Sequence, residues 1–269
     1  GFRTTDGAGV KLVRVLGNLT TKEFDPILML DSFDSINPDD YTAGFPMHPH
    51  RGIETISYVS RGKMVHRDSL GNEAGISDGE VQWMNSGSGI MHEEMVPAAE
   101  RLLGVQLWLN LPAKDKMSKP SYNSIKNEDI KEIEIEGGKI RLLAGKYGEH
   151  EGYKGDYLSM DYYDIHLNAD AEVTLTMEED DSVMVFTLLG DVYIDGEHIE
   201  EKTAVKLTEG DSLTIKNGNE KAQVLYMNSR ALNEPVAWAG PIVMNTQEEL
   251  QKAFLELRSN TFIKETAEY

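Results

Sequence analysis

Two short segments of the chain carry histidines and carboxylates at a spacing that suits metal binding. The first contains His48 and His50, and the second contains His92 and Glu94. Side chains at i and i+2 share one face of an extended strand, so each pair would present its two side chains together, whereas Glu93 would point away. Two such strands inside a small barrel would place three imidazoles and one carboxylate around a point. This donor set, without thiolate, suits Fe(II), Mn, Co, Ni, Cu or Zn and leaves positions open for water or substrate.

Other candidate ligands have a weaker pattern. Glu54 has the same parity as His48 and His50, but the intervening Arg51-Gly52 can break the strand register. Glu54 could therefore be a ligand, a hydrogen-bond partner of a ligand, or neither. The remaining histidines are interpreted as surface or hydrogen-bonded structural residues, and among them His66 could lie behind a ligand, although a loop-stabilising role is favoured. These residues are His66, His150, His166 and His198.

Short apolar or alternating runs, separated by Gly, Asn and Asp, must form the elements that position these side chains. Many are rich in Val, Ile, Thr and Tyr, which predicts a mostly β protein built as a sandwich or barrel. Asp195-Gly196 and Asn217-Gly218-Asn219 are typical of hairpin turns. The predicted strands are Val10–Val15, Ile53–Val59, Leu103–Leu109, Lys139–Leu143, Ala171–Met177, Val183–Leu189, Val192–Ile194, Ser212–Ile215 and Ala222–Met227.

One helix is predicted near the end of the chain. Thr246 and Glu249 have the spacing of a capping box, which marks a helix start. Apolar residues then recur at i, i+3, i+4 and i+7, as on one face of a helix. They are Leu250, Ala253, Phe254 and Leu257. We expect this apolar stripe to dock on a barrel wall.

The composition changes between Leu111 and about Lys131. The polar segment between Pro112 and Pro120 is typical of a linker or an excursion between two β units. We therefore predict an N-terminal metal-binding domain over residues 1–125 and a C-terminal domain without a metal site over residues 126–269, which ends in the helix. Each part is long enough to form its own barrel.

Composition and charge exclude several classes of function. The 269 residues include no cysteine, which removes disulfides, thiolate metal sites and cysteine nucleophiles. The formal net charge of −20 disfavours direct binding to nucleic acid or to anionic membranes. No apolar run approaches the roughly 20 residues of a membrane span, and no signal peptide opens the sequence. We expect a soluble, cytoplasmic protein.

Residues 44–95 resemble the signature region of the pirin family, within the cupin superfamily. The matching strings are Phe45-Pro46-x-His48-Pro49-His50-Arg51-Gly52-x-Glu54-Thr55, His66-Arg67-Asp68-Ser69-x-Gly71-Asn72 and Gly79-x-Val81-Gln82-Trp83-Met84-x-x-Gly87-x-Gly89-Ile90-x-His92-x-Glu94. Further matches are Gln106-Leu107-Trp108-x-Asn110-Leu111-Pro112 and Gly240-Pro241-x-Val243-Met244-Asn245-Thr246. Together they extend across almost the whole chain.

The resemblance implies an all-β bicupin, with two cupin-type β-barrel (jelly-roll) domains face to face and one metal in the N-terminal barrel. The metal ligands of the family fall on the four residues that strand parity also selects, which are His48, His50, His92 and Glu94. Many other cupins take their carboxylate ligand from the position of Glu54, but the pirin-like His-x-Glu ending favours Glu94. The C-terminal half has no His-x-His pair, so we expect no second metal there.

The resemblance also implies an activity, because pirin-like proteins are similar to quercetin 2,3-dioxygenases. We expect oxidative ring opening of a flavonol-like small molecule by O2 at one divalent metal, preferably Fe(II), with Glu94 able to accept a proton. The alternative is a metal-dependent regulator of transcription or of metabolic enzymes, which would act through a protein partner without catalysis. A third reading is a metal with a structural role only. We expect a monomer in each case.

Overall fold

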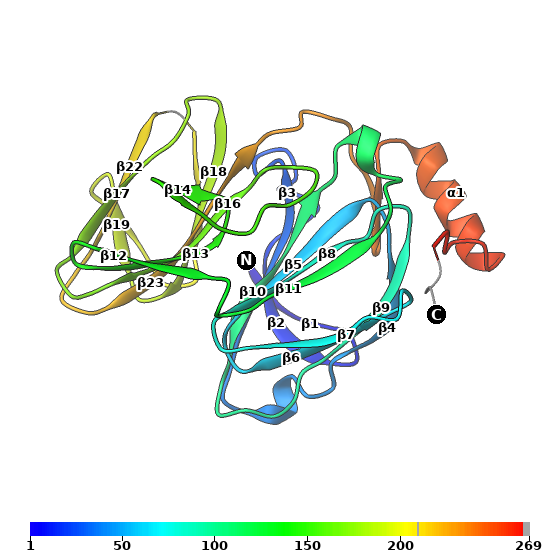
Figure 1. The fold of residues 1–269 in the computed structure, drawn as a ribbon, viewed down its shortest axis with the longest axis horizontal. Helices are drawn as coiled ribbons and strands as arrows, with labels where there is room; N and C mark the ends of the chain where they lie inside the picture. The colour runs from blue at the N-terminus through cyan, green and yellow to red at the C-terminus, as the bar shows by residue number, and fades with distance from the viewer. Residues whose placement is uncertain (209, 266–269) are drawn as a thin grey trace. The chain divides into compact units, whose positions relative to one another are not determined.

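Strands follow one another along almost the whole chain in the structure, a computed structural model that describes residues 1–208 and 210–265 (Figure 1). They collect into two units. The first unit comprises residues 1–22, residues 27–126 and the chain from Leu232 onward, and the second comprises residues 23–26 and 127–231. The prediction of a mostly β protein is confirmed.

Two antiparallel sheets build the first unit. One has seven strands in the order β1-β2-β3-β10-β5-β8-β11, and the other has four in the order β4-β9-β6-β7. The strands are β1 (Phe2–Asp6), β2 (Val10–Leu16), β3 (Ile27–Ser35), β4 (Phe45–His50), β5 (Ile53–Arg61), β6 (Lys63–Asp68), β7 (Glu73–Ser77), β8 (Glu80–Asn85), β9 (Ile90–Met95), β10 (Leu102–Asn110) and β11 (Ser121–Ile125). Two short 3-10 helices, η1 (Pro38–Asp40) and η2 (Ala113–Asp115), lie in the connections.

The second unit repeats this plan with a six-stranded sheet in the order β12-β13-β16-β23-β18-β21 and a four-stranded sheet in the order β17-β22-β19-β20. A small hairpin of β14 and β15 accompanies them. The strands are β12 (Lys131–Ile135), β13 (Gly138–Ala144), β14 (Lys146–Tyr147), β15 (His150–Glu151), β16 (Asp161–Leu167), β17 (Glu172–Thr176), β18 (Asp181–Leu189), β19 (Val192–Ile194), β20 (Glu197–Ile199), β21 (Ala204–Leu207), β22 (Ser212–Asn217) and β23 (Ala222–Arg230).

The two predicted hairpin turns have different outcomes. Asp195 and Gly196 have φ values of 51° and 81° and join the paired strands β19 and β20, so this prediction is confirmed. The prediction for Asn217-Gly218-Asn219 is wrong, because β22 and β23 belong to different sheets. The Asn217 side chain instead donates to the carbonyls of Asn168 and Glu220, which favours a connection between sheets over a hairpin.

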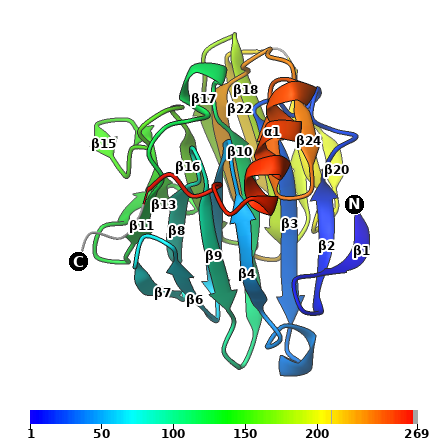
Figure 2. The same ribbon diagram turned by 90° about the vertical axis from the view of Figure 1, so that its right-hand side faces the viewer.

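The last part of the chain returns to the first unit as the hairpin of β24 (Ala237–Ala239) and β25 (Ile242–Met244), followed by α1 (Gln247–Arg258) (Figure 2). The predicted capping box of α1 is present, with Thr246 accepting from the backbone of Glu249. Leu250 and Ala253 are buried on the predicted stripe. By its contacts, this segment groups with the first unit, whereas the sequence prediction places it in the C-terminal domain.

Contacts around Arg51 explain this return. The buried guanidinium pairs with Glu256 of α1 at 2.7 Å, donates to the carbonyl of Phe262 at 3.0 Å and lies 4.2 Å from the centre of the Phe262 ring. The backbone of Arg51 also accepts from Val243. A buried charge requires such partners, so the C-terminal segment satisfies a residue of the first unit.

The segment between Pro112 and Pro120 is an excursion over the first unit. Lys116 is 1% exposed, and its Nζ donates to the carbonyl of Gly52 at 2.8 Å, to Asn110 Oδ1 at 2.7 Å and to the carbonyl of Val243 at 3.1 Å. Burial lowers the pKa of this ammonium to about 8. The chain leaves the first unit only after Lys126.

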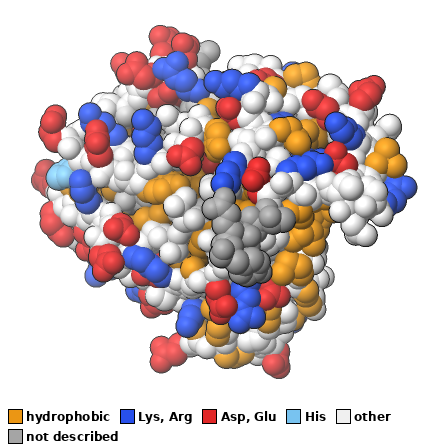
Figure 3. Space-filling model, turned by 45° about the vertical axis from the view of Figure 1, so that its right-hand side comes forward, with side chains coloured by type: hydrophobic (Ala, Val, Ile, Leu, Met, Phe, Trp, Pro, Cys, Tyr) orange, Lys and Arg blue, Asp and Glu red, His pale blue; other side chains and the backbone are white. Residues whose placement is uncertain are grey.

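Acidic and basic side chains are interspersed on the face shown in Figure 3. In the described part of the chain, α1 has 12 residues, and no helix has both the length and the apolar character needed to span a membrane.

Candidate metal centre

Three of the four predicted ligands converge on one point of the first unit. His48 and His50 lie on β4 and His92 lies on β9, and these strands run side by side (Figures 1 and 2). His48 is directly opposite His92 in the register, and their ring centres are 4.3 Å apart. The potential ligand atoms of the three histidines all lie within 4.8 Å of one another. His48 and His50 thus lie together as the i, i+2 spacing predicts, and the β4–β9 register shifts just before His48.

The hydrogen bonds of His48 and His50 determine which nitrogen faces the centre. The Nδ1 atom of His48 lies 2.8 Å from the carbonyl of Pro46, and that of His50 lies 3.0 Å from the carbonyl of Pro241. A carbonyl only accepts, so each Nδ1 carries the proton and each Nε2 presents a lone pair. The two Nε2 atoms are 3.0 Å apart, so two lone pairs face each other.

The third histidine completes this arrangement. His92 Nε2 is buried and has no hydrogen-bond partner among the described residues. A buried nitrogen without a partner, next to two converging lone pairs, is what a divalent cation would satisfy. The residues present therefore fit a metal ion, with His48, His50 and His92 as its holders.

Burial keeps His50 and His92 neutral. Burial, together with the neighbouring His48 ring, lowers the pKa of His50 to about 3. Burial also lowers the pKa of His92 well below its ordinary value, again helped by the nearby imidazoles. Because metal ions bind the neutral imidazole, His50 and His92 need no deprotonation near neutral pH.

Glu94, the fourth predicted ligand, is 1% exposed and lies on the same face of β9 as His92. Its carboxylate does not lie with the ligand atoms of the three histidines. It accepts hydrogen bonds from the side-chain amides of Gln82 and Gln106 instead. Tyr122 donates to the Gln82 carbonyl oxygen at 3.3 Å and so turns the amide nitrogen of Gln82 toward Glu94. Burial, with the charges of Glu94 and Asp68, raises the pKa of Tyr122 and keeps its hydroxyl protonated.

Glu54 lies on the other face of its sheet. On β5, Ser57 is opposite Gln106 in the register and its hydroxyl accepts from Gln106, so Ser57 faces the centre. Glu54 is three residues away on the same strand and must face the opposite side. The intervening Gly52, with φ 80°, separates β4 from β5 and breaks the parity that linked Glu54 to the histidines.

The other histidines divide into one inside the barrel and three outside it. His66 is fully buried, and its Nδ1 atom lies 3.4 Å from the Nδ1 atom of His92. It therefore lies behind a proposed ligand, which is the less favoured of its two sequence interpretations. His150 is exposed on β15. His166 pairs with Asp164 at 2.8 Å, and His198 pairs with Asp191 at 2.9 Å, both in the second unit.

A cavity of about 630 Å³ opens beside His48 and His50. Trp108 and Trp238 form one aromatic wall, with ring centres 5.5 Å apart, and Trp108 meets the His50 ring edge-on at 5.1 Å. No role is predicted from the sequence for Trp108, Trp238, Gln82 or Gln106. Three of them, Gln82, Gln106 and Trp108, nevertheless fall within the sequence motifs that resemble the pirin family. The lining residues are Asp6, Gly7, Arg14, Asn18, Met29, Phe45, Pro46, His48, His50, Gln106, Trp108, Trp238, Gly240 and Pro241.

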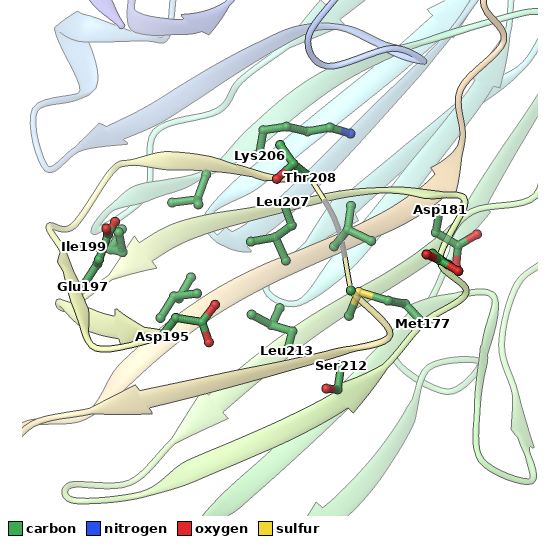
Figure 4. Close-up of a pocket in the computed structure, with 15 residues that line it drawn as sticks. Met177, Asp181, Asp195, Glu197, Ile199, Lys206, Leu207, Thr208, Ser212 and Leu213 are labelled. Atoms are coloured by element: carbon green, nitrogen blue, oxygen red, sulfur yellow. The ribbon is translucent and has the colours of Figure 1, made fainter.

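The second unit has a different cavity, of about 300 Å³, shown in Figure 4. Leu207 and Leu213 lie within it, while Asp181, Asp195 and Glu197 lie at its edges. No histidine is among the described residues that line it. Its apolar wall and acidic edge offer no set of imidazole ligands like that of the first unit.

Comparisons with known proteins identify the family, and the second family model extends past the end of the second unit at residue 231. The family model for pirin matches residues 9–109, and the model for the pirin C-terminal cupin domain matches residues 162–263. A pirin-like protein of Caulobacter vibrioides is 38% identical over 97% of this chain and 96% of its own length, and pirin of Homo sapiens is 35% identical over 95% and 89%. The solved structure of a quercetin 2,3-dioxygenase from Acinetobacter baumannii has a TM-score of 0.88 at 30% identity, covering 97% of this chain and 95% of that chain.

Proposed function

Since the chain belongs to the pirin family, we propose that it is a metal-dependent dioxygenase of the quercetin 2,3-dioxygenase type, which opens the ring of a flavonol with O2. The observation that carries this proposal is the convergence of three imidazoles beside a cavity of about 630 Å³ with an aromatic wall. That volume lies within the usual range of small-molecule sites. The similarity to a solved quercetin 2,3-dioxygenase supports it.

His48, His50 and His92 are the proposed metal ligands, and Glu94 is the proposed fourth ligand. Fe(II) is the preferred ion, although the same donors accept Mn, Co, Ni, Cu or Zn. When bound, the metal supplies Lewis acidity that favours the anionic form of a flavonol hydroxyl. Glu94 is buried and lies two residues after His92 on β9, on the same face of the strand.

The protein's own side chains would bind and orient the substrate. Trp108 and Trp238 offer an apolar, aromatic wall suited to a planar ring system. Glu94 is the proposed acceptor of the proton of the flavonol hydroxyl. The amides of Gln82 and Gln106 orient its carboxylate.

Metal analysis followed by aerobic quercetin turnover tests the proposal. The metal-loaded protein should hold one equivalent of metal and bleach the flavonol absorbance, and the metal-stripped protein should not. His48→Ala should lose both properties, while His150→Ala, a change at an exposed histidine of the second unit, should retain both. One equivalent of metal without bleaching of any flavonol would reject the enzyme and favour a metal-dependent protein that acts through a partner.

A further inference from the structure

We propose that Asp68, His66 and His92 form a hydrogen-bonded relay that fixes the Nε2 lone pair of His92 on the metal side. His66 is then a positioning residue of the metal centre, acting through His92. The inference rests on the metal-binding part of the proposed function and is independent of the flavonol activity.

The three side chains share one face of the four-stranded sheet. Asp68 at the end of β6 is opposite His92 in the register, and His66 lies two residues before Asp68. His66 Nε2 is 2.8 Å from Asp68 Oδ2, and His66 Nδ1 is 3.4 Å from His92 Nδ1. His66 and Asp68 side chains are both 0% exposed. Tyr122 stacks on the His66 ring at 3.9 Å with an interplanar angle of 9°, which fixes the ring plane.

Asp68 already accepts from groups that can only donate. Oδ1 accepts from the backbone N–H groups of Leu70 at 2.9 Å and Asn72 at 3.1 Å, and Oδ2 accepts from the Asn72 side chain at 2.9 Å. Three hydrogen bonds from N–H donors stabilise the ionised form, so Asp68 is a carboxylate. The proton between Asp68 and His66 therefore belongs to His66 Nε2, and this bond is charge-assisted.

The proton positions on His92 follow by elimination. With its proton on Nε2, neutral His66 presents Nδ1 as an acceptor, so His92 Nδ1 donates and His92 Nε2 keeps a lone pair. If His66 Nδ1 donated to His92 Nδ1 instead, the proton of neutral His92 would be on Nε2, which is buried without a partner among the described residues. A buried N–H without an acceptor is rare in native structures. All three ligand histidines then have the same protonation, with Nδ1–H bonded outward and Nε2 directed to the centre.

This relay keeps the proton of His92 on Nδ1, as the carbonyls of Pro46 and Pro241 do for His48 and His50. A carboxylate bonded through a second group to a ligating imidazole orients the ring and increases its basicity. Asp68 is the last residue of β6, and its hydrogen bonds to Leu70 and Asn72 in the following turn hold it independently of the metal. The relay therefore exists before the metal binds.

Two variants of His66 separate its hydrogen bonding from its packing. His66→Phe fills the space and can stack on Tyr122 but neither accepts nor donates, whereas His66→Gln supplies one acceptor and one donor. The matched control is His166→Phe, because His166 has the same two-residue spacing and the same 2.8 Å bond to Asp164, but lies in the second unit. Isothermal titration of the metal-free proteins with Co(II) at fixed pH should show an affinity about 10- to 100-fold weaker in His66→Phe. His66→Gln should recover most of that loss, and His166→Phe should match the parent protein.

Nitrogen-15 NMR of the metal-free protein gives a readout that a packing role would not move. The imidazole couplings of His92 should show the Nδ1–H form in the parent protein and a substantial Nε2–H population in His66→Phe. Should His66→Phe fail to fold, Asp68→Asn is measured in the same two ways and should shift both readouts in the same direction. An Nε2–H form of His92 in the parent protein, or parental Co(II) affinity in the folded variant, would overturn the relay. A parent protein that binds no metal would reject the metal centre itself, and the NMR result would still decide the relay.

Discussion

Glu94→Gln keeps the shape of the side chain but removes its charge and converts one of its acceptor atoms into a donor. In the parent protein, Gln106 Nε2 lies 2.9 Å from Glu94 Oε2, and Gln82 Nε2 donates to Oε1. The new amide nitrogen must face one of these two amide nitrogens. At least one buried, charge-assisted hydrogen bond is therefore lost, and the centre also loses its proposed fourth ligand.

These two losses have separate magnitudes. Leaving a buried donor unsatisfied costs about 1–3 kcal/mol. For a domain of this size, each kcal/mol lowers Tm by about 2–4 °C, so metal-free Glu94→Gln should unfold roughly 2–12 °C below the metal-free parent. Metal at 1,000 times its Kd stabilises the parent protein by about 4 kcal/mol, and a variant with weaker metal binding recovers less of this at the same concentration.

Thermal unfolding with and without metal, followed by metal analysis and quercetin turnover, measures both effects. The control is Glu93→Gln on the same strand, because Glu93 points to the other face, is 25% exposed and forms a long 3.7 Å ion pair with Arg67. Exposed pairs of this kind contribute about 0–1 kcal/mol, so the control should behave as the parent protein does. Parental metal affinity and full turnover in Glu94→Gln would refute the assignment of Glu94 as ligand and proton acceptor. Glu54 would not replace it, since it faces the other side of its sheet.

Three further predictions concern the frame around the centre. His50→Ala should retain the parental far-UV circular dichroism but lose its metal on dialysis, as measured by elemental analysis. Glu256→Gln removes the carboxylate partner of buried Arg51 and should cost about 2 kcal/mol in chemical denaturation, less than the roughly 3–5 kcal/mol of a fully buried pair because Glu256 is 14% exposed. Lys116 has a pKa of about 8 in the folded protein and 10.5 ordinarily, so between pH 8 and 10.5 the unfolded chain binds a proton that the folded protein has lost. The free energy of unfolding should therefore rise by about 2 kcal/mol from pH 8 to 10.5. Lys116→Met should lack this rise.

The part of the site that sequence predicts best is the part governed by strand parity. His48, His50 and His92 need only two extended segments and one shared face, and both requirements are local. Nine predicted strands recur with ends shifted by at most a few residues, because Val-, Ile- and Thr-rich runs with turn residues between them are also local signals. The capping box of Thr246 and Glu249 is likewise a local signal, because it needs only four consecutive residues.

Strand parity does not predict features that depend on contacts between segments far apart in the sequence. Glu54 shares the parity of His48, yet the positive φ of Gly52 starts a new strand and turns the carboxylate away. His66 has no neighbour in sequence that marks it as a partner of a ligand, since its relation to His92 arises from the pairing of β6 with β9. The hairpin prediction at Asn217 fails for a similar reason, because a local turn signal does not determine to which sheet the next strand belongs.

The return of the C-terminal segment shows how far such contacts extend. The carbonyl of Pro241 accepts from His50 Nδ1 across 191 residues of sequence, and so sets which nitrogen of His50 faces the centre. A Cβ atom at Gly52 would lie 1.9 Å from the carbonyl oxygen of Val243, so only glycine permits the two segments to approach. Arg51, between these two contacts, is buried and pairs with Glu256 of α1. A first unit ending at residue 125 would thus contain all three histidines but lack the acceptor that orients His50 and the carboxylate that neutralises Arg51. The metal centre therefore requires the chain beyond the second unit, although none of the proposed ligands lies there.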